Sequence, residues 1–428
     1  MSRQSHQDTV ALAVGTLVGG VLAYLFFALV TRGLGADAAA PVSVLWTYWT
    51  VAAAVLTFPL QHWTIRTLAA DGHEGTVARS RGRIWGGAVG LSVFSGVVAY
   101  VGRDVLFRSD AVAFPAMIAG LTAGACLSGL VRGGLAGRGL YVATGMAVAA
   151  ENVVRVVLAG IVTILGGGAV AFGAVLTVGS LSGLLWRASL RFEASEAVGA
   201  PLGSPLALAS GLAVGSLISQ IVLTGGPVVL AAIGGSPDDV TSLFIALAVW
   251  RAPYMVALGV APQLTPRLTQ LAMGGDAGRL RWIRRWSALA VVAGSVVAAT
   301  IGATLAGPLI RLVFGPDVGL DAVALALIGV GTAVGLGNLL LLLILLAHGR
   351  SRFVTAAWVG GLGTAVLWIA LLPGAPLSRV VGAFVAAQGV AFVLQVTAGA
   401  AALRQSAPAA DVTAAAEAAS AQAPPGTL

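Results

Sequence analysis

The residues best suited to chemistry in this sequence are charged side chains set inside long apolar stretches. Glu151, Asn152 and Arg155 lie near the middle of one apolar run, and Arg251 lies near the middle of another. A charge at the centre of a membrane-spanning helix costs at least ~2.5 kcal/mol, so such a group faces a partner or a water-filled cavity. These four positions are therefore the first candidates for a functional site.

The spacing of these residues is compatible with two roles for Glu151. Glu151 and Arg155 are four residues apart, so they share one helix face and could neutralise each other. Alternatively, together with Asn152, they contact a substrate, and Glu151 is the one carboxylate placed to serve as an intramembrane proton or sodium site. Arg251 has no acidic residue within helical reach and is the stronger ligand candidate. Because arginine binds phosphate and carboxylate groups through paired hydrogen bonds, this set indicates an anionic cargo.

Three further polar residues complete the predicted site. Gln220 and Asn338 interrupt apolar runs, where hydrogen bonds between helices are the simpler explanation. Arg32 follows the first apolar run and could be an anchor that snorkels to the membrane surface. The predicted substrate-binding residues are Arg251, Arg155, Glu151, Asn152, Arg32, Gln220 and Asn338.

Enzymatic function is not expected. The loops on the side that we predict to be outside have about 4 to 11 residues, too few to build an acid–base site. The sequence has no HExxH motif, no paired His and Cys spacing and no phosphate-binding loop ending in GK[ST]. We therefore predict no metal, no cofactor and no catalytic residues.

Composition places the chain in a membrane. Hydrophobic residues make up 58% of 428 and charged residues 9%, whereas soluble domains carry about 25% charge. The net charge of +8 comes entirely from arginine, and no basic tract is present, so nucleic-acid binding is not expected. The single cysteine, Cys126, excludes an internal disulfide and is expected to be a packing residue.

Continuous apolar runs of about 20 residues predict transmembrane helices rather than a barrel. We expect an all-α, polytopic protein of about twelve such helices. The expected spans are 10–31, 43–60, 84–102, 111–131, 140–165, 170–188, 206–233, 240–262, 287–312, 322–347, 353–372 and 380–403.

Arginine asymmetry between alternate loops predicts the orientation. Seventeen of the 24 basic residues, Arg132 and Arg138 among them, fall on one side and five on the other. The richer side is expected to be cytoplasmic and to hold both termini. Residues 405–428 are rich in Ala, Pro and Ser and are expected to form a disordered cytoplasmic tail.

The two halves of the chain resemble each other. The pattern at 110–113 recurs at 321–324, and the pattern at 137–144 recurs at 349–356, at offsets of 211 and 212 residues. Similar segments, 105–107 and 312–314, precede the first of these pairs. Six helices per half is an even number, so both halves keep the same orientation and form a parallel repeat. We predict two six-helix bundles, at 1–195 and 196–404. Two such bundles facing each other are typical of alternating-access transporters.

Several short segments resemble the polysaccharide flippases of the multidrug/oligosaccharidyl-lipid/polysaccharide exporter superfamily. Residues 32–36 resemble the turn that follows the first helix of that family, and 58–61, followed by Arg66, resemble the end of the second. Pro253 and Pro262 with Arg267 resemble the eighth helix and its exit, and 307–315 resemble the end of the ninth helix.

The resemblance implies a flippase in the inner (plasma) membrane that moves a polyprenyl-pyrophosphate-linked oligosaccharide outward for surface polysaccharide or lipopolysaccharide biosynthesis in the cell envelope. It implies a cavity lined mainly by helices 1, 2, 7 and 8, with Arg251 holding the headgroup. Expected partners are the lipid-linked oligosaccharide, membrane lipids and a polysaccharide polymerase or glycosyltransferases. The alternative is a cation-coupled multidrug-type antiporter of the same superfamily.

Overall fold

The structure is a computed structural model of the chain. It describes residues 3–71, 74–109, 111–193, 212–273, 277–347 and 351–405. Within these ranges the regular structure is helical and no β-strand occurs. The prediction of an all-α polytopic protein is confirmed.

The helices follow one another with short connections. The first half of the chain forms α1 (Arg3–Ala52), η1 (Ala53–Thr57), α2 (Phe58–Asp71), α3 (Gly75–Val101), α4 (Arg103–Leu106), α5 (Ala113–Gly137), α6 (Tyr141–Ile164), α7 (Ala169–Leu181) and η2 (Ser182–Leu190). The second half forms α9 (Leu212–Thr224), α10 (Gly226–Ala232), α11 (Pro237–Met273), α12 (Ala277–Ile301), η3 (Gly302–Ala306), α13 (Gly307–Phe314), α14 (Ala322–Ala347), α15 (Ser351–Leu371) and α16 (Pro376–Gln405).

Ten of the twelve membrane spans expected from hydropathy correspond to apolar helices among the described residues, and the seventh and eighth do not. The described residues contain nine helical segments long and apolar enough to cross a membrane. One of them, Val18–Ile65, has 48 residues and contains most of the first expected span and all of the second. The expected seventh span falls partly on residues that are not described, and the eighth lies within α11.

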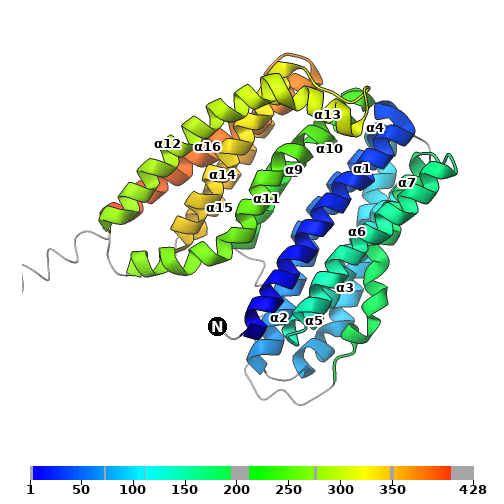
Figure 1. The fold of residues 1–428 in the computed structure, drawn as a ribbon, viewed down its shortest axis with the longest axis horizontal. Coiled ribbons are helices and arrows are strands. Elements are labelled where there is room, and N and C mark those ends of the chain that lie inside the picture. Colours follow the sequence, from blue (N-terminus) through cyan, green and yellow to red (C-terminus); the bar gives the residue numbers. More distant parts are fainter. Residues whose placement is uncertain are drawn as a thin grey trace, which may run out of the picture.

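The described helices form two groups (Figure 1). Helices α1–α7 pack against one another, and so do α9–α16. Packing partners recur between the groups: α3 contacts α5 as α12 contacts α14, and α5 contacts α7 as α14 contacts α16. We call them the N-terminal and C-terminal bundles. The predicted boundary at residue 195 and the tail after residue 405 lie outside the described residues.

The two bundles meet at one end and diverge towards the other (Figure 1). The contact end carries α4, α10 and α13, and the divergent end carries the N-terminus and the start of α12. Contacts between the bundles are made mainly by α1 with α11.

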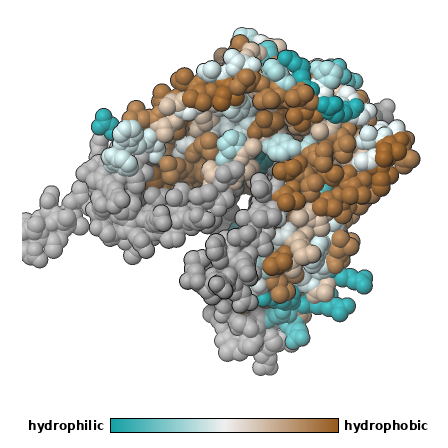
Figure 2. All heavy atoms as spheres, viewed as in Figure 1, coloured by the Kyte–Doolittle hydropathy of each residue, from teal (hydrophilic) through white to brown (hydrophobic). Residues whose placement is uncertain are grey.

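Apolar side chains cover much of the described outer surface (Figure 2). Helices α3 and α12 are the least enclosed: only 17% and 11% of the residues in their most apolar stretches are buried. Exposed valines at this density would be unfavourable in water, but they match a hydrocarbon environment.

Gly35 allows the chain to reverse between the first two spans. Its φ of 78° and ψ of 168° interrupt the helical backbone of α1. A positive φ is disfavoured for residues with a Cβ atom, and glycine adopts it without strain. No atom lies within 4 Å of the position of a Cβ at Gly35, so backbone conformation alone selects glycine here.

Gly35→Ala is therefore expected to lower the free energy of unfolding by about 1–2 kcal/mol through backbone strain. Gly20→Ala, in the helical part of α1 with equally open surroundings, is the matched control and should be neutral or stabilising by up to ~1 kcal/mol. Thermal unfolding in detergent measures both variants. Equal shifts in the two would contradict this role of Gly35.

Candidate functional site

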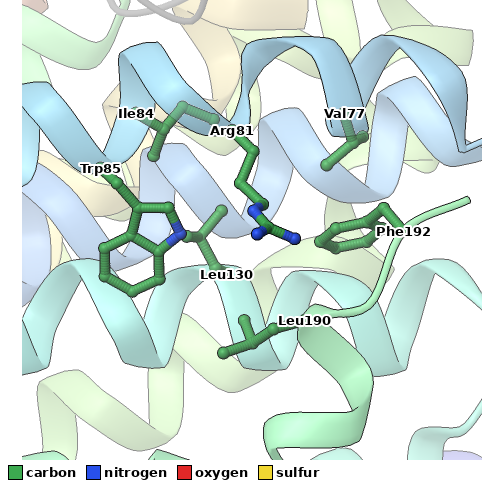
Figure 3. A pocket seen from close by; sticks show the side chains of 7 residues that line it. All are labelled: Val77, Arg81, Ile84, Trp85, Leu130, Leu190 and Phe192. Atoms are coloured by element: carbon green, nitrogen blue, oxygen red, sulfur yellow. The ribbon is translucent and has the colours of Figure 1, made fainter. Parts of the chain in front are cut away.

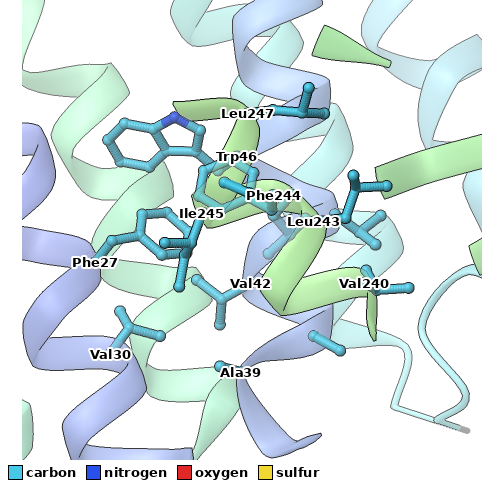
Figure 4. Packing of buried hydrophobic residues seen from close by; sticks show 14 of the residues in the cluster. Phe27, Val30, Ala39, Val42, Trp46, Val240, Leu243, Phe244, Ile245 and Leu247 are labelled. Carbon is cyan, nitrogen blue, oxygen red and sulfur yellow. The ribbon is translucent and has the colours of Figure 1, made fainter. Parts of the chain in front are cut away.

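Aromatic side chains close the contact end between α1 and α11 (Figure 4). The rings of Phe27 and Phe244 lie 4.2 Å apart, and the ring of Trp46 lies 5.2 Å from that of Phe27. All three side chains are buried. Between apolar helices in lipid the hydrophobic effect gives little, so van der Waals packing of this kind holds the bundles together.

Two arginines of the N-terminal bundle add hydrogen bonds at the same end. Arg32 Nε donates to the carbonyl of Val313 at 2.8 Å, and its Nη2 donates to the carbonyl of Leu312. Arg108 donates to the carbonyl of Gly235. The last carbonyls of a helix have no partner within it and carry a partial negative charge, so α13 presents natural acceptors to Arg32.

A network of charges lies inside the N-terminal bundle. Glu151 on α6 accepts from Arg155 Nη2 through Oε1 and from Arg132 Nη2 through Oε2, both at 2.5 Å. Arg155 is 0% exposed and Glu151 is 3% exposed. The structure thus contains the expected pair of Glu151 and Arg155, with a second arginine contributed by α5.

Arg155 is enclosed by further partners. Its Nη1 donates to Asn152 Oδ1 at 3.3 Å, and its Nη2 donates to Ser180 Oγ of α7 at 3.1 Å. Its guanidinium lies 4.2 Å from the ring centre of Trp49 and 5.2 Å from that of Trp46, both on α1. The carboxylate, the amide and two aromatic faces together stabilise the buried cation.

Arg132 is the member of this network that sequence reasoning missed. We assigned it to the arginine-rich membrane edge, but it lies within α5, with its side chain 15% exposed. Helices α5 and α6 are joined by a tight turn near Gly139, which has φ 73°. Arg132 lies five residues before the end of α5 and Glu151 ten residues after the start of α6, a difference of about 7.5 Å along the helices. Hairpin register therefore did not indicate this contact, which depends on the length of the Arg132 side chain.

Arg251 lies on α11 where helices of both bundles meet. Its Nη2 donates to Gln220 Oε1 of α9 at 3.2 Å, and its buried Nε has no hydrogen-bond partner. The Tyr24 hydroxyl of α1 donates to the carbonyl of Ala248 at 2.6 Å, one turn before Arg251. Among the described residues, Tyr24 and Tyr254 are the titratable side chains that interact with Arg251.

Arg155 and Arg251 therefore differ in how their charges are compensated. Arg155 has a carboxylate at 2.5 Å, whereas no salt bridge to Arg251 exists in the described ranges. A cation in a low-dielectric setting requires a counter-charge or water. Each of the two keeps a buried Nε without a hydrogen-bond partner, but only Arg251 also lacks a carboxylate among the described residues, so it is the better placed to bind an anionic ligand.

Asn338 lies within the C-terminal bundle. Its Nδ2 donates to Gln388 Oε1 at 2.9 Å, and its Oδ1 accepts from Gln395 Nε2 at 3.4 Å. All three amides are at most 1% exposed. This geometry joins α14 to α16.

The structure thus divides the seven predicted site residues among four places. Glu151, Asn152 and Arg155 are together in the N-terminal bundle, and Arg251 is together with Gln220. Arg32 is at the contact end, and Asn338 is inside the C-terminal bundle. Their binding of a substrate stays a prediction. No group of His, Cys, Asp and Glu that could hold a metal occurs in the part of the chain that the structure describes.

Known structures of transporters share this arrangement of helices. A multidrug resistance MATE family transporter of the MOP superfamily in an inward-facing conformation matches with a TM-score of 0.69 and 17% identity, over 93% of this chain and 98% of that chain. The chain has the fold of a MOP superfamily transporter. No protein-family model and no curated protein matches it.

Two further MOP structures extend the comparison. An outward-facing multidrug resistance MATE family transporter matches with a TM-score of 0.56 and 17% identity, over 93% of this chain and 96% of that chain. A MOP superfamily transporter from Pyrococcus furiosus, described as having a binding pocket of reverse polarity that suggests a different function, matches with a TM-score of 0.59 and 18% identity, over the same shares. The chain as a whole thus superposes better on the inward-facing structure than on the outward-facing one.

Glu151→Gln is expected to destabilise the protein by about 3–5 kcal/mol, because it leaves two enclosed arginines without a counter-charge. Glu74→Gln is the matched control: Glu74 pairs with Arg138 at 2.7 Å but is 25% exposed, so the loss should be about 1 kcal/mol or less. Denaturant unfolding of both variants measures the difference. A Glu151→Gln protein as stable as Glu74→Gln would contradict a structural role for the network.

Proposed function

We propose that the protein is an alternating-access membrane transporter that moves an anionic amphiphilic molecule. The observation that carries the proposal is Arg251, a partly buried arginine at the meeting of α1, α9 and α11. It has an amide partner but no carboxylate partner among the described residues. An anionic cargo supplies the missing counter-charge.

The depth of Arg251 supports a binding role. It is 14 residues from Pro237, where α11 begins at the contact end, which corresponds to roughly 20 Å along the helix. Transporters built from two repeats bind their substrates near the middle of the membrane, between the bundles.

The arrangement of the bundles supports alternating access. They are packed at the contact end by aromatic side chains and by Arg32, and they diverge at the other end (Figure 1). The higher TM-score to the inward-facing structure and the arginine-rich loops at the divergent end favour a cytoplasmic assignment for that end. Both termini would then be cytoplasmic, in the plasma membrane.

The cargo that fits these features is a polyprenyl-pyrophosphate-linked oligosaccharide for cell-envelope polysaccharide synthesis. Its pyrophosphate matches the guanidinium of Arg251, and Gln220 offers an amide beside it for sugar hydroxyls. The lipid tail would stay in the bilayer while the headgroup crosses between the bundles. The MOP structure whose binding pocket of reverse polarity is described as suggesting a different function supports a function for this chain other than multidrug transport.

A cation-coupled multidrug antiporter is the second candidate, favoured by the multidrug resistance MATE transporters among the structural relatives. Such a carrier requires a carboxylate that exchanges protons or sodium. Glu151 is held by two arginines at 2.5 Å, so its negative charge is already balanced by the protein.

Flipping of a fluorescent lipid-linked sugar in proteoliposomes tests the proposal. The wild-type protein should flip it, and Arg251→Ala should lower the rate by about tenfold or more, the loss expected for a charge-assisted hydrogen bond. Arg251→Lys should retain part of the rate because the charge remains. Arg352→Ala removes an arginine that stacks on Phe353 at the divergent end and is the control, expected at the wild-type rate.

The two candidate functions give opposite results with imposed gradients. Flipping that proceeds without a sodium or proton gradient agrees with the anionic-cargo proposal. Drug efflux that requires such a gradient, combined with unchanged flipping in Arg251→Ala, would replace it with the antiporter.

A further inference from the structure

The start of α3 carries arginines that no described carboxylate neutralises. Arg81 and Arg83 are exposed and form no salt bridge within the described residues. Glu74, which precedes the helix, is already occupied: it accepts from Arg138 Nε at 2.7 Å and from the backbone N–H of Glu193 at 2.8 Å. The hydrogen bond from Arg138 lowers the pKa of Glu74, so that carboxylate is ionised and paired. The surface at Arg81 therefore keeps its positive charge.

The Arg81 guanidinium lies at a small pocket with apolar walls, beside the ring of Phe192 (Figure 3). The walls are formed by Val77, Ile84, Trp85, Leu130, Leu190 and Phe192. The pocket encloses about 10 Å³, the space of roughly one water molecule. A ligand of any size must therefore lie across its mouth, in contact with both the cation and the apolar surface.

An apolar stripe continues from this point along α3 towards the membrane centre. Trp85, Val89, Val93 and Val97 follow Arg81 at intervals of four residues, so they form one ridge on the helix surface. The three valines are 61%, 60% and 56% exposed. A guanidinium, an indole at the membrane interface and a lipid-facing ridge thus follow one another in line.

We infer that this part of α3 binds an anionic phospholipid, with its phosphate on Arg81 and its acyl chains along the ridge from Val89 to Val97. Arg83, two residues further on, points to another face of the helix and adds positive charge at the same membrane surface. A soluble phosphate would gain the charge contact but nothing from the apolar ridge. A zwitterionic lipid would gain the ridge but carries its own cation next to the phosphate. An anionic phospholipid satisfies both features. The inference concerns the membrane around the protein and does not depend on what is transported.

The equivalent helix of the C-terminal bundle carries the same types of residue. On α12, Trp282 and Trp286 are 61% and 55% exposed, and Arg285 is exposed between them. Exposed Val292 and Val296 follow further along the helix. Each bundle would thus hold an anionic lipid on its most lipid-exposed helix, at the divergent end where the bundles are apart.

Native mass spectrometry of the purified full-length protein with equimolar phosphatidylglycerol and phosphatidylcholine tests the site. The wild-type protein should retain phosphatidylglycerol preferentially. The double substitution R81Q/R83Q should reduce that retention by about fivefold for each arginine, as expected for a basic side chain at an anionic surface. Arg81→Lys, which keeps the charge, should retain the lipid, and added salt should weaken the wild-type preference.

Arg103→Gln is the matched control: this arginine is the first residue of α4, just beyond the far end of α3, and already contacts Asp104 and Tyr100, so lipid retention should not change. Wild-type retention by R81Q/R83Q would overturn the inference. So would equal retention of both lipids by the wild-type protein, or displacement of phosphatidylglycerol by millimolar inorganic phosphate, which would assign the site to a free anion. If R81Q/R83Q does not elute as a folded protein, the wild-type protein tests the inference alone: it must prefer phosphatidylglycerol and lose that preference in added salt.

Discussion

The low dielectric of a membrane-embedded helix bundle is the constraint on which this structure depends, because every charge inside it must be balanced nearby. The N-terminal bundle balances Arg155 and Arg132 with Glu151 and encloses Arg155 between Trp46, Trp49 and Ser180. Helices α1, α5, α6 and α7 are joined by these contacts into one body. Arg251 is not balanced in this way, and it lies where the two bundles meet.

The contacts between the two bundles differ in kind from the charge network inside the N-terminal bundle. At the contact end, the charged groups that join the bundles donate to backbone carbonyls at helix ends, as Arg32 does to α13. Such bonds exchange for bonds to water when the ends part, and neither side is left with an isolated carboxylate. A fold held by rigid bundles and by replaceable contacts at one end is mechanically suited to rocking between two states.

Hydropathy and the repeated segments were sufficient to predict the helices, since length and apolar content alone decide which segments cross a membrane. The pairing of Glu151 with Arg155 followed from helical spacing. What spacing cannot supply is which neighbour faces a residue. Arg132 was assigned to the membrane edge, and Asn338 was expected to bond between helices without a partner being named, whereas the structure pairs it with Gln388 and Gln395. Both assignments depend on how α5 packs on α6 and α14 on α16, and that packing is decided by side-chain shape across helices.

The most direct test of the alternating-access account is a pair of distances between spin labels on the two bundles. Val112→Cys with Val323→Cys reports on the contact end, and Val142→Cys with Arg352→Cys reports on the divergent end; the native Cys126 is buried. Double electron–electron resonance in nanodiscs measures both distances with and without a lipid-linked sugar. The account predicts that cargo shifts the two distances in opposite directions, the contact end widening as the divergent end narrows. Distances that stay fixed, or that change together, would contradict it.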